Sequence, residues 1–307
     1  MAAAPTVEAV RIGYAAINRE LADAGVSSHA RFILRSYSPE RFRTTLAANL
    51  AGLRAILAWN VEHGLLAHRI SSNLVPFGSH PVLDVDWAAE FAGELAAFAR
   101  SHDLRLSFHP GQYTLINSPD EDVHRRSVDD LDHHCRVLEA MGLDTTHKIQ
   151  IHGGGTYGDV AAAVERFAAR YRALPDRIRS RLVVENEDFG ITYREVVEIA
   201  DRCGVPVLLD SLHLEVTDPE VRVRDALARV LPTWGPDDGV PLLDYSSQDP
   251  AKRPGAHAQS LDLAHFEAWL DEVGDTDVDV VLEIKDKEPS AVAAAGVVAA
   301  RVVSTGR

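Results

Sequence analysis

Histidine and acidic residues recur where short apolar runs of the chain end. SFHPGQY contains His109, IQIHGGG contains His152, and LVVENED contains Glu185. Other runs of this kind lead to His80, Asp210, His213, Asp244, His257 and Glu283. Each residue alone is more simply explained as a hydrogen-bonded structural group or a helix cap. Together, imidazole nitrogens and carboxylate oxygens form a donor set that favours zinc, manganese or iron over calcium or magnesium.

The number of these candidate ligands exceeds what one metal ion requires, so the sequence predicts a site with two or three ions. Clustered carboxylates raise one another's pKa unless cations offset their charge. Two or more such ions suit phosphodiester hydrolysis, because they activate a water and stabilise charge on the leaving oxygen. Other chemistries have less support: GGGTYG lacks the Lys-Ser/Thr ending of a P-loop, and no serine lies in a GxSxG motif.

These residues act together only if the fold brings the ends of the apolar runs to one place. The chain repeats a strand-like run followed by a helical pattern about eight times. The expected strands are residues 10–16, 69–76, 105–109, 148–152, 181–186, 206–210, 241–245 and 279–283. Helical patterns include residues 39–62, 87–102, 120–141 and 160–172.

Near-continuous apolar strands that alternate with helices are typical of parallel strands buried on both faces. Eight such units predict an α/β fold, a closed (β/α)₈ TIM barrel in a single domain of residues 1–307 with a core at about 10–295. In such a barrel the ends of all the strands meet at one mouth. The long, partly irregular connection at residues 18–39 is a candidate substrate-gripping loop.

A formal net charge of −15 argues, taken alone, against a nucleic-acid partner. Net charge is a sum over the whole surface, however, so a local basic rim can coexist with an acidic remainder. Bound divalent ions would also offset acidic groups at the site. Arg41 and Arg43, near the start of the first long helix, are candidates for phosphate contacts, with surface solubility an equal alternative.

Cellular setting follows from what the sequence lacks. No apolar run is long enough to cross a bilayer, and the first residues do not resemble a secretory signal. Cys135 and Cys203 are too few for a disulfide framework and are expected to be buried thiols. We therefore expect a cytoplasmic, monomeric enzyme with no membrane partner.

The order of the motifs resembles that of the UV damage endonucleases. The resemblance runs from about residue 10 to 295 through RIGYAAIN, RISSNLVPFGSHP, SFHPGQY, IHGG, VVEN, LLDSLH, YSSQ, GAHA and LEIKDKE. HPGQY, VVEN and DxxH are also similar to endonuclease IV, an abasic-site enzyme with the same barrel. The resemblance implies a DNA repair enzyme that nicks damaged double-stranded DNA 5′ to a dipyrimidine lesion, leaving a 3′-hydroxyl and a 5′-phosphate. It also implies a cluster of divalent metals, with manganese expected and zinc or magnesium as alternatives.

The same resemblance implies how the ligands are shared. His80 and His109 would share a metal with Glu185, which would bridge to a second metal and so be essential for catalysis. Asp210 and Glu283 would complete the second metal.

A third metal would be held by His213 and His257, and His152 belongs to the same cluster. Strand seven departs from the family pattern. Asp244 stands where family members carry a histidine, and Leu242 stands where some carry a lysine that can be modified into a ligand. That modification is impossible at Leu242. We therefore expect strand seven to change the number of ligands that hold the second and third metals.

Three further residues are implied to contact the lesion. Gln112 and Tyr113 match the pair that the family inserts into the duplex, and Tyr14 matches the tyrosine opposite them. An amide and an aromatic ring on a rigid turn suit this work, because they can replace and stack on displaced bases; ordinary packing is the alternative for Tyr113. Lys285 is a candidate catalytic residue that contacts the phosphate, or else forms a solvated pair with Asp286.

Three other functions remain open on sequence grounds. A sugar or sugar-phosphate isomerase could use two metals on the same barrel, and the acidic charge favours it. The resemblance to endonuclease IV keeps an abasic-site endonuclease open. A metal-binding protein without catalysis fits least well, because the polar residues converge on an open mouth.

Overall fold

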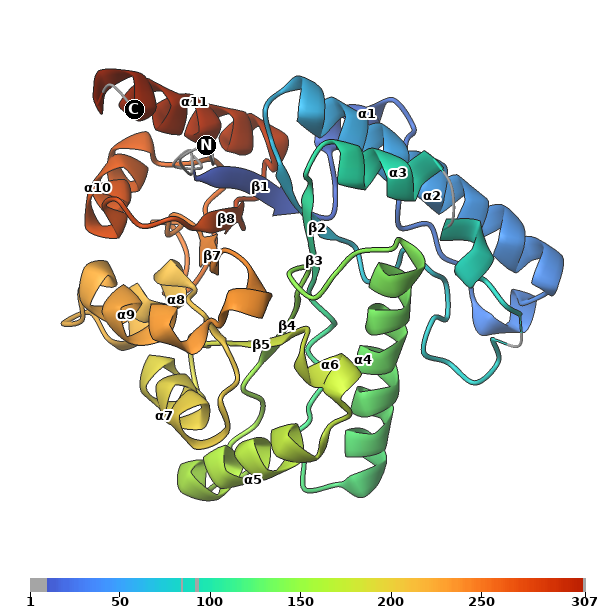
Figure 1. Cartoon of the computed structure of the whole chain (residues 1–307), viewed down its shortest axis with the longest axis horizontal. Helices are drawn as coiled ribbons and strands as arrows, with labels where there is room; N and C mark the ends of the chain where they lie inside the picture. Colours follow the sequence, from blue (N-terminus) through green and yellow to red (C-terminus); the bar gives the residue numbers. More distant parts are fainter. Residues whose placement is uncertain (1–9, 84, 92–93, 306–307) are drawn as a thin grey trace, which may run out of the picture.

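Eight parallel strands form one curled sheet in the residues that the structure describes. The computed structural model describes residues 10–83, 85–91 and 94–305. Figure 1 shows the strands at the centre of the molecule with helices around them. The strands are β1 (Arg11–Ala15), β2 (Ala67–Ile70), β3 (Arg105–Phe108), β4 (Ile149–His152), β5 (Leu182–Glu185), β6 (Val207–Leu208), β7 (Leu242–Tyr245) and β8 (Asp279–Leu282).

The sheet closes on itself between β6 and β7. Its order is β6-β5-β4-β3-β2-β1-β8-β7, which leaves β6 and β7 as the two ends. These ends meet at a parallel bridge between Asp210 and Asp244, where the Asp244 amide donates to the Leu209 carbonyl at 3.0 Å. The predicted (β/α)₈ barrel is thereby confirmed, and all the strands end at the same mouth.

Helices alternate with the strands and cover the outside of the barrel (Figure 1). They are α1 (Arg19–Asp23), η1 (Leu34–Ser36), α2 (Pro39–Glu62), η2 (Ala88–Phe91), α3 (Glu94–Ser101), α4 (Glu121–Ala140), α5 (Val160–Ala173), α6 (Asp176–Arg179), α7 (Tyr193–Cys203), α8 (Ser211–Thr217), α9 (Val223–Val230), η3 (Leu231–Thr233), η4 (Pro236–Asp238), α10 (Leu263–Val273) and α11 (Glu288–Thr305). None of the helices in the described ranges is long and apolar enough to span a membrane.

Local signals in the sequence fix several helix ends. The α2 helix has the predicted bounds, because Ser38 accepts a hydrogen bond from the Arg41 amide and Pro39 occupies the first helical position. The α7 helix begins with a capping box of Thr192 and Glu195 and ends at Gly204, whose φ of 77° favours glycine.

The second strand differs from its prediction. It was expected at residues 69–76 and lies at Ala67–Ile70, after which the chain turns, with the Leu74 amide donating to the Ser71 carbonyl. Leu74 and Val75 are buried, but they pack as part of a loop, so their apolar character reflects the core and not strand pairing. The helix expected at 87–102 is divided into η2 and α3. The expected irregular stretch at 18–39 contains only α1 and η1 in its described structure.

Alternation along the strands sorts the barrel interior into layers. Charged side chains fill the lower layer, where Arg11 donates to Asp279 at 2.8 Å. Apolar side chains fill the middle layer, and those that pack together are Val183, Leu208, Leu242 and Val281. Two residues further along several strands, the next inward-facing layer lies at the mouth. This layer carries most of the candidate ligands.

Candidate metal centre

Two groups of ligands form at the mouth of the barrel, and both contain Glu185. His109, His152 and Glu185 offer atoms within 4.8 Å of one another, and so do Glu185, Asp210 and His213. These residues follow or end β3, β4, β5 and β6. The structure therefore brings five of the predicted residues together, and their role as metal ligands stays a prediction.

The first group surrounds one oxygen of Glu185. His109 Nε2 and His152 Nε2 are each 3.3 Å from Glu185 Oε2, and they are 3.2 Å from each other. Burial alone would raise the pKa of Glu185, but His152 and His109 hold it well below its ordinary value. Glu185 is therefore an ionised carboxylate that two imidazoles approach from the same side.

The second group surrounds the other oxygen of Glu185. His213 Nδ1 is 3.5 Å from Glu185 Oε1 and 2.8 Å from the carbonyl oxygen of Asn186. Since a carbonyl only accepts, Nδ1 carries a proton, which leaves Nε2 as the nitrogen that could bind an ion. Burial raises the pKa of Asp210 to about 6, His213 opposes this rise and Glu185 adds to it.

This donor set fits a divalent metal ion. In the part of the chain that the structure describes, Asp210 Oδ2 and His109 Nδ1 are buried without a hydrogen-bond partner. A buried carboxylate oxygen without a partner is costly, and a cation is the group that removes this cost. Mixed imidazole and carboxylate donors suit manganese or zinc. The residues present can therefore hold one or two ions, with Glu185 shared between them.

Glu283 and Asp244 lie beside this centre but make different contacts. Arg69 donates to Glu283 through Nη1 and to Asp244 through Nη2. His257 Nε2 is 3.6 Å from Glu283 Oε2, and its Nδ1 lies 2.7 Å from the Glu283 carbonyl oxygen. Among the described residues, neither carboxylate belongs to the two ligand groups, and nor does His257.

His80 and Lys285 are placed differently from their predicted roles. His80 is exposed in the loop after β2, and its Nδ1 accepts a hydrogen bond from the Val82 amide at 3.0 Å. Its loop position explains why it lies in neither ligand group. Lys285 Nζ is 3.8 Å from Asp249 Oδ2, and the adjacent Lys252 lowers the pKa of Lys285. The metal contact of His80 and the phosphate contact of Lys285 stay predictions.

Gln112 and Tyr113 occupy an exposed turn directly after His109. Tyr113 is 80% exposed, which argues against its alternative interpretation as a packing residue. The turn is held by Thr114, whose amide donates to the Gly111 carbonyl at 2.9 Å and whose hydroxyl donates to Asp130 at 2.8 Å. A fixed turn thus presents an amide and an aromatic ring to solvent at the mouth.

Tyr14 is buried between β1 and α2. It is fully buried, its hydroxyl donates to Asn60 Oδ1 at 2.6 Å and it accepts from Asn18 at 3.0 Å. Strand alternation explains this, because its neighbours Gly13 and Ala15 face the barrel interior and Tyr14 must face α2. The exposed position that a lesion contact requires is therefore not the one that Tyr14 occupies.

Three polar residues near the centre were not singled out in the sequence. Arg69 and Gln150 lie inside the barrel, and Gln150 Nε2 donates to both Glu185 and Asp244. Glu187 Oε2 lies 3.7 Å from His152 Nδ1, and burial raises its pKa to about 7. Arg69 and Gln150 occupy inward-facing positions of their strands, so the periodicity of the strands could have identified them from the sequence.

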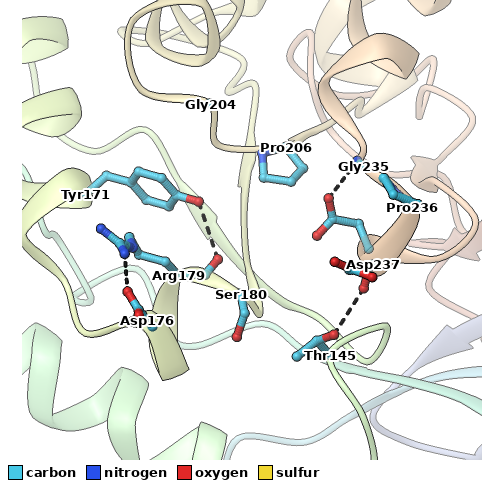
Figure 2. A pocket seen from close by; sticks show the side chains of 11 residues that line it. Thr145, Tyr171, Asp176, Arg179, Ser180, Gly204, Pro206, Gly235, Pro236 and Asp237 are labelled. Atoms are coloured by element: carbon cyan, nitrogen blue, oxygen red, sulfur yellow. Dashed lines mark hydrogen bonds and ion pairs between the residues drawn. The ribbon is translucent and has the colours of Figure 1, made fainter.

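A separate pocket of about 410 Å³ lies at the opposite end of the barrel. Figure 2 shows Tyr171, Asp176 and Arg179 on one side of it and Gly235 and Pro236 on the other. Its lining residues precede strands, and its polar groups pair among themselves, as Arg179 does with Asp176. The pocket therefore contains none of the candidate ligands, and the mouth is the candidate site.

Comparison with known proteins places this barrel in a family. The model of the family described as UV-endonuclease UvdE matches residues 10–294. The chain belongs to this family. A UV DNA damage endonuclease of Clostridium perfringens (strain 13 / Type A) is 33% identical over 288 residues, which is 92% of this chain and 69% of the relative. One of Bacillus velezensis (strain DSM 23117 / BGSC 10A6 / LMG 26770 / FZB42) is 31% identical over 294 residues, covering 91% and 90%.

A solved structure agrees with this membership. The crystal structure of SacUVDE has a TM-score of 0.88 and 37% identity, and the match covers 95% of this chain and 98% of that chain. The resemblance to UV damage endonucleases that the sequence motifs indicated is confirmed. Membership of the UvdE family supports an endonuclease, and therefore a hydrolase, that acts in DNA repair.

Proposed function

We propose that this UvdE-family chain hydrolyses the phosphodiester bond 5′ to UV-induced dipyrimidine lesions with divalent ions at the barrel mouth. The observation that carries the proposal is the sharing of Glu185 by two ligand groups. Two adjacent ions joined by one carboxylate suit an in-line displacement at phosphorus. Such ions supply Lewis acidity and a water of lowered pKa, with manganese the expected metal and zinc or magnesium the alternatives.

The chain's own residues supply positioning. His109, His152 and Glu185 would hold one ion, and Glu185, Asp210 and His213 the other. Asn186 fixes the His213 ring by accepting the Nδ1 proton at 2.8 Å. Glu283 with His257 would extend the centre toward a third ion. His80 is exposed in its loop, and it would join His109 at the first ion only after that loop changes conformation.

The segment that joins β1 to α2, together with the first residues of α2, offers the positive charge that a DNA partner requires. Residues 29–43 carry four arginines against one glutamate, a net charge of +3 in a chain of −15. The arginines are Arg31, Arg35, Arg41 and Arg43, and all four are exposed. No ion pair within residues 10–83, 85–91 and 94–305 neutralises them. The segment packs on the His80 loop through Phe32 and Phe77, whose rings are 5.1 Å apart, so it borders the mouth.

Large apolar side chains are also exposed around the mouth. Tyr113, Tyr157 and Phe189, the last 71% exposed, lie on the loops after β3, β4 and β5. Ile33 and Leu34 are exposed within the basic segment after β1. Such side chains are rarely left in solvent together, and they suit stacking on bases or insertion between base steps. Charge and exposed rings therefore favour a DNA partner over a sugar.

Nicking of damaged plasmid tests the proposed function. Purified protein with manganese is expected to relax supercoiled plasmid after UV irradiation and to leave untreated plasmid intact, with EDTA abolishing the activity. A 5′-labelled duplex with one cyclobutane dimer should give a product that ends in a 3′-hydroxyl immediately 5′ to the dimer, which a polymerase can extend. Nicking of abasic plasmid alone would indicate an abasic-site endonuclease. Ketose–aldose interconversion without any nicking would contradict a nuclease.

Asp130 on α4 is expected to couple two mouth loops. Its Oδ1 accepts from Ser79 in the His80 loop at 2.8 Å, and its Oδ2 accepts from Thr114 in the Gln112–Tyr113 turn at 2.8 Å. Asp130→Ala removes both of these hydrogen bonds, so the two loops can shift relative to bound DNA. Because a small displacement of positioning residues lowers the rate, nicking at subsaturating DNA should be slower by roughly tenfold. The bound metal per chain should not change.

Asp129→Ala is the matched control for this change. Asp129 is on the same helix and pairs with Arg125 at 3.7 Å on the exposed side. Equal rates for the two variants, or a loss of metal from Asp130→Ala, would show that Asp130 does not act through the loops.

A further inference from the structure

Arg69 places a fixed positive charge inside the barrel, next to the candidate metal centre. Its side chain is 4% exposed, on the inward face of β2. A buried guanidinium is tolerated only when carboxylates and hydrogen-bond acceptors surround it. Its Nη2 donates to Asp244 and to Gln150 Oε1, the latter at 2.7 Å, and its Nη1 donates to Glu283. Arg69 thus joins the carboxylates of β7 and β8.

Both oxygens of Asp244 are already used in this arrangement. Oδ1 accepts from Arg69, and Oδ2 accepts from Gln150 Nε2 at 2.6 Å. Asp210 differs in this respect, because its Oδ2 is buried without a hydrogen-bond partner among the described residues, and its ion-pair neighbour His213 Nδ1 is 3.8 Å away. Asp210 therefore has an oxygen to offer an ion, whereas Asp244 would have to give up a hydrogen bond to do so.

The orientation of the Gln150 amide follows from Arg69. Since Arg69 only donates, Oε1 must face the guanidinium, and Nε2 must face Asp244 and Glu185. One Nε2 proton then goes to Asp244 and the other to Glu185 Oε2, the oxygen that lies 3.3 Å from His109 and His152. Below this layer, Leu242 packs with Val183, Leu208 and Val281. The hydrogen bonds of the network therefore border apolar side chains, and hydrogen bonds are stronger in such surroundings than in water.

We propose that Asp244 is the buried counter-ion of Arg69 and not a metal ligand, and that Arg69, Gln150 and Asp244 together position Glu185. The family pattern suggested the strand-seven residue as a metal ligand, whereas in this chain Asp244 balances the charge of Arg69 and helps to hold Glu185 in place. The proposal deepens the proposed function, since Glu185 is the carboxylate shared by the two ligand groups.

Metal stoichiometry and stability without metal test the proposal together. Manganese bound per chain is measured by titration with electron paramagnetic resonance of the free ion, and Tm is measured in EDTA. Asp244→Asn should bind as many ions as the wild type, but its Tm in EDTA should be lower by roughly 5–10 °C, because it breaks a buried ion pair. Asp210→Asn is the matched control. It should lose about one ion per chain with little change of Tm in EDTA, because asparagine keeps the oxygen that accepts from the His213 amide at 2.8 Å and replaces only the oxygen that has no hydrogen-bond partner among the described residues.

Gln150→Met provides a second test that leaves every carboxylate in place. The number of manganese sites should be unchanged, while manganese affinity should fall roughly 10–100-fold, the usual effect of losing a residue that orients a ligand. The Tm decrease in EDTA of the Asp244→Asn/Gln150→Met double variant should be smaller than the sum of the single decreases, because both act on one network.

Either of two outcomes overturns the role of Asp244: the same loss of ions in Asp244→Asn as in Asp210→Asn, or a Tm in EDTA equal to that of the wild type. Unchanged manganese affinity in Gln150→Met removes the positioning of Glu185. A wild-type chain that binds no divalent ion would refute the proposed function, whereas the Tm comparison would still decide the Arg69–Asp244 pair.

Discussion

Replacing Glu185 by glutamine is expected to abolish nicking of UV-irradiated DNA while leaving the barrel folded. Glu185 is 1% exposed, and its two oxygens face different ligand groups, with Oε2 toward His109 and His152 and Oε1 toward His213. The amide keeps the shape of the side chain but removes the negative charge that both ions would share. Loss of a residue that merely supports a ligand commonly costs 10–100-fold, so the nicking rate should fall by at least about 100-fold.

Initial rates on irradiated plasmid, with manganese varied to saturation, measure this effect. Glu288→Gln is the matched control, because Glu288 is also a buried carboxylate, but it accepts from the amides of Arg19 and Glu20 at 2.8 and 2.7 Å and lies outside both ligand groups of the described residues. Its rate should fall far less. Glu185→Gln activity within tenfold of the wild type at saturating manganese would contradict a shared, bridging carboxylate.

Strand periodicity accounts for most of the site that could be predicted from the sequence. Successive residues of a strand face opposite sides, so His152, Glu185 and Asp210, each at or next to a strand end, all face the interior once the strands are placed. The same rule could have excluded Tyr14 from the mouth, since its neighbours must face inward. The prediction for Tyr14 was based on the family motif and did not consider which residues of β1 alternate between the inward and outward faces.

Loop geometry accounts for what the sequence could not provide. His80 belongs to a loop whose turns depend on tertiary contacts, such as the hydrogen bond from Ser79 to Asp130. No periodicity describes such a loop, and the misplaced second strand shows the same limit, because Leu74 and Val75 are apolar for reasons of packing. A motif can name a loop residue, but only the folded chain determines where its side chain lies.

The role of strand seven depends on a contact between residues that are distant in sequence. Asp244 and Arg69 meet across the barrel, and each appears in its own strand as an isolated charged residue. Periodicity places both inside, yet it does not say which carboxylates contact the guanidinium. The departure from the family pattern at Asp244 becomes interpretable only when Arg69 and Gln150 are seen beside it.

Replacing Gln112 and Tyr113 by alanine is expected to weaken recognition of damaged DNA without affecting the metal centre. The two side chains are exposed on a turn that Thr114 anchors to α4, so their removal leaves the backbone and His109 in place. Stacking of an aromatic ring on a base contributes about 1–3 kcal/mol, so affinity for a duplex with one dimer should fall roughly 10–100-fold. Affinity for undamaged duplex should change much less, because phosphate contacts dominate it.

Fluorescence anisotropy with both duplexes measures the ratio of the two affinities, and the Glu185→Gln background prevents cleavage during the titration. Tyr157→Ala is the matched control, an exposed tyrosine on the next loop whose ring lies 5.4 Å from the Arg166 guanidinium carbon. If Tyr157→Ala lowered the ratio as much as the double variant, any ring at the mouth would serve, and no special role would belong to the turn after His109. A ratio that falls only with Gln112 and Tyr113 would identify that turn as the part of the barrel that distinguishes damaged from intact DNA.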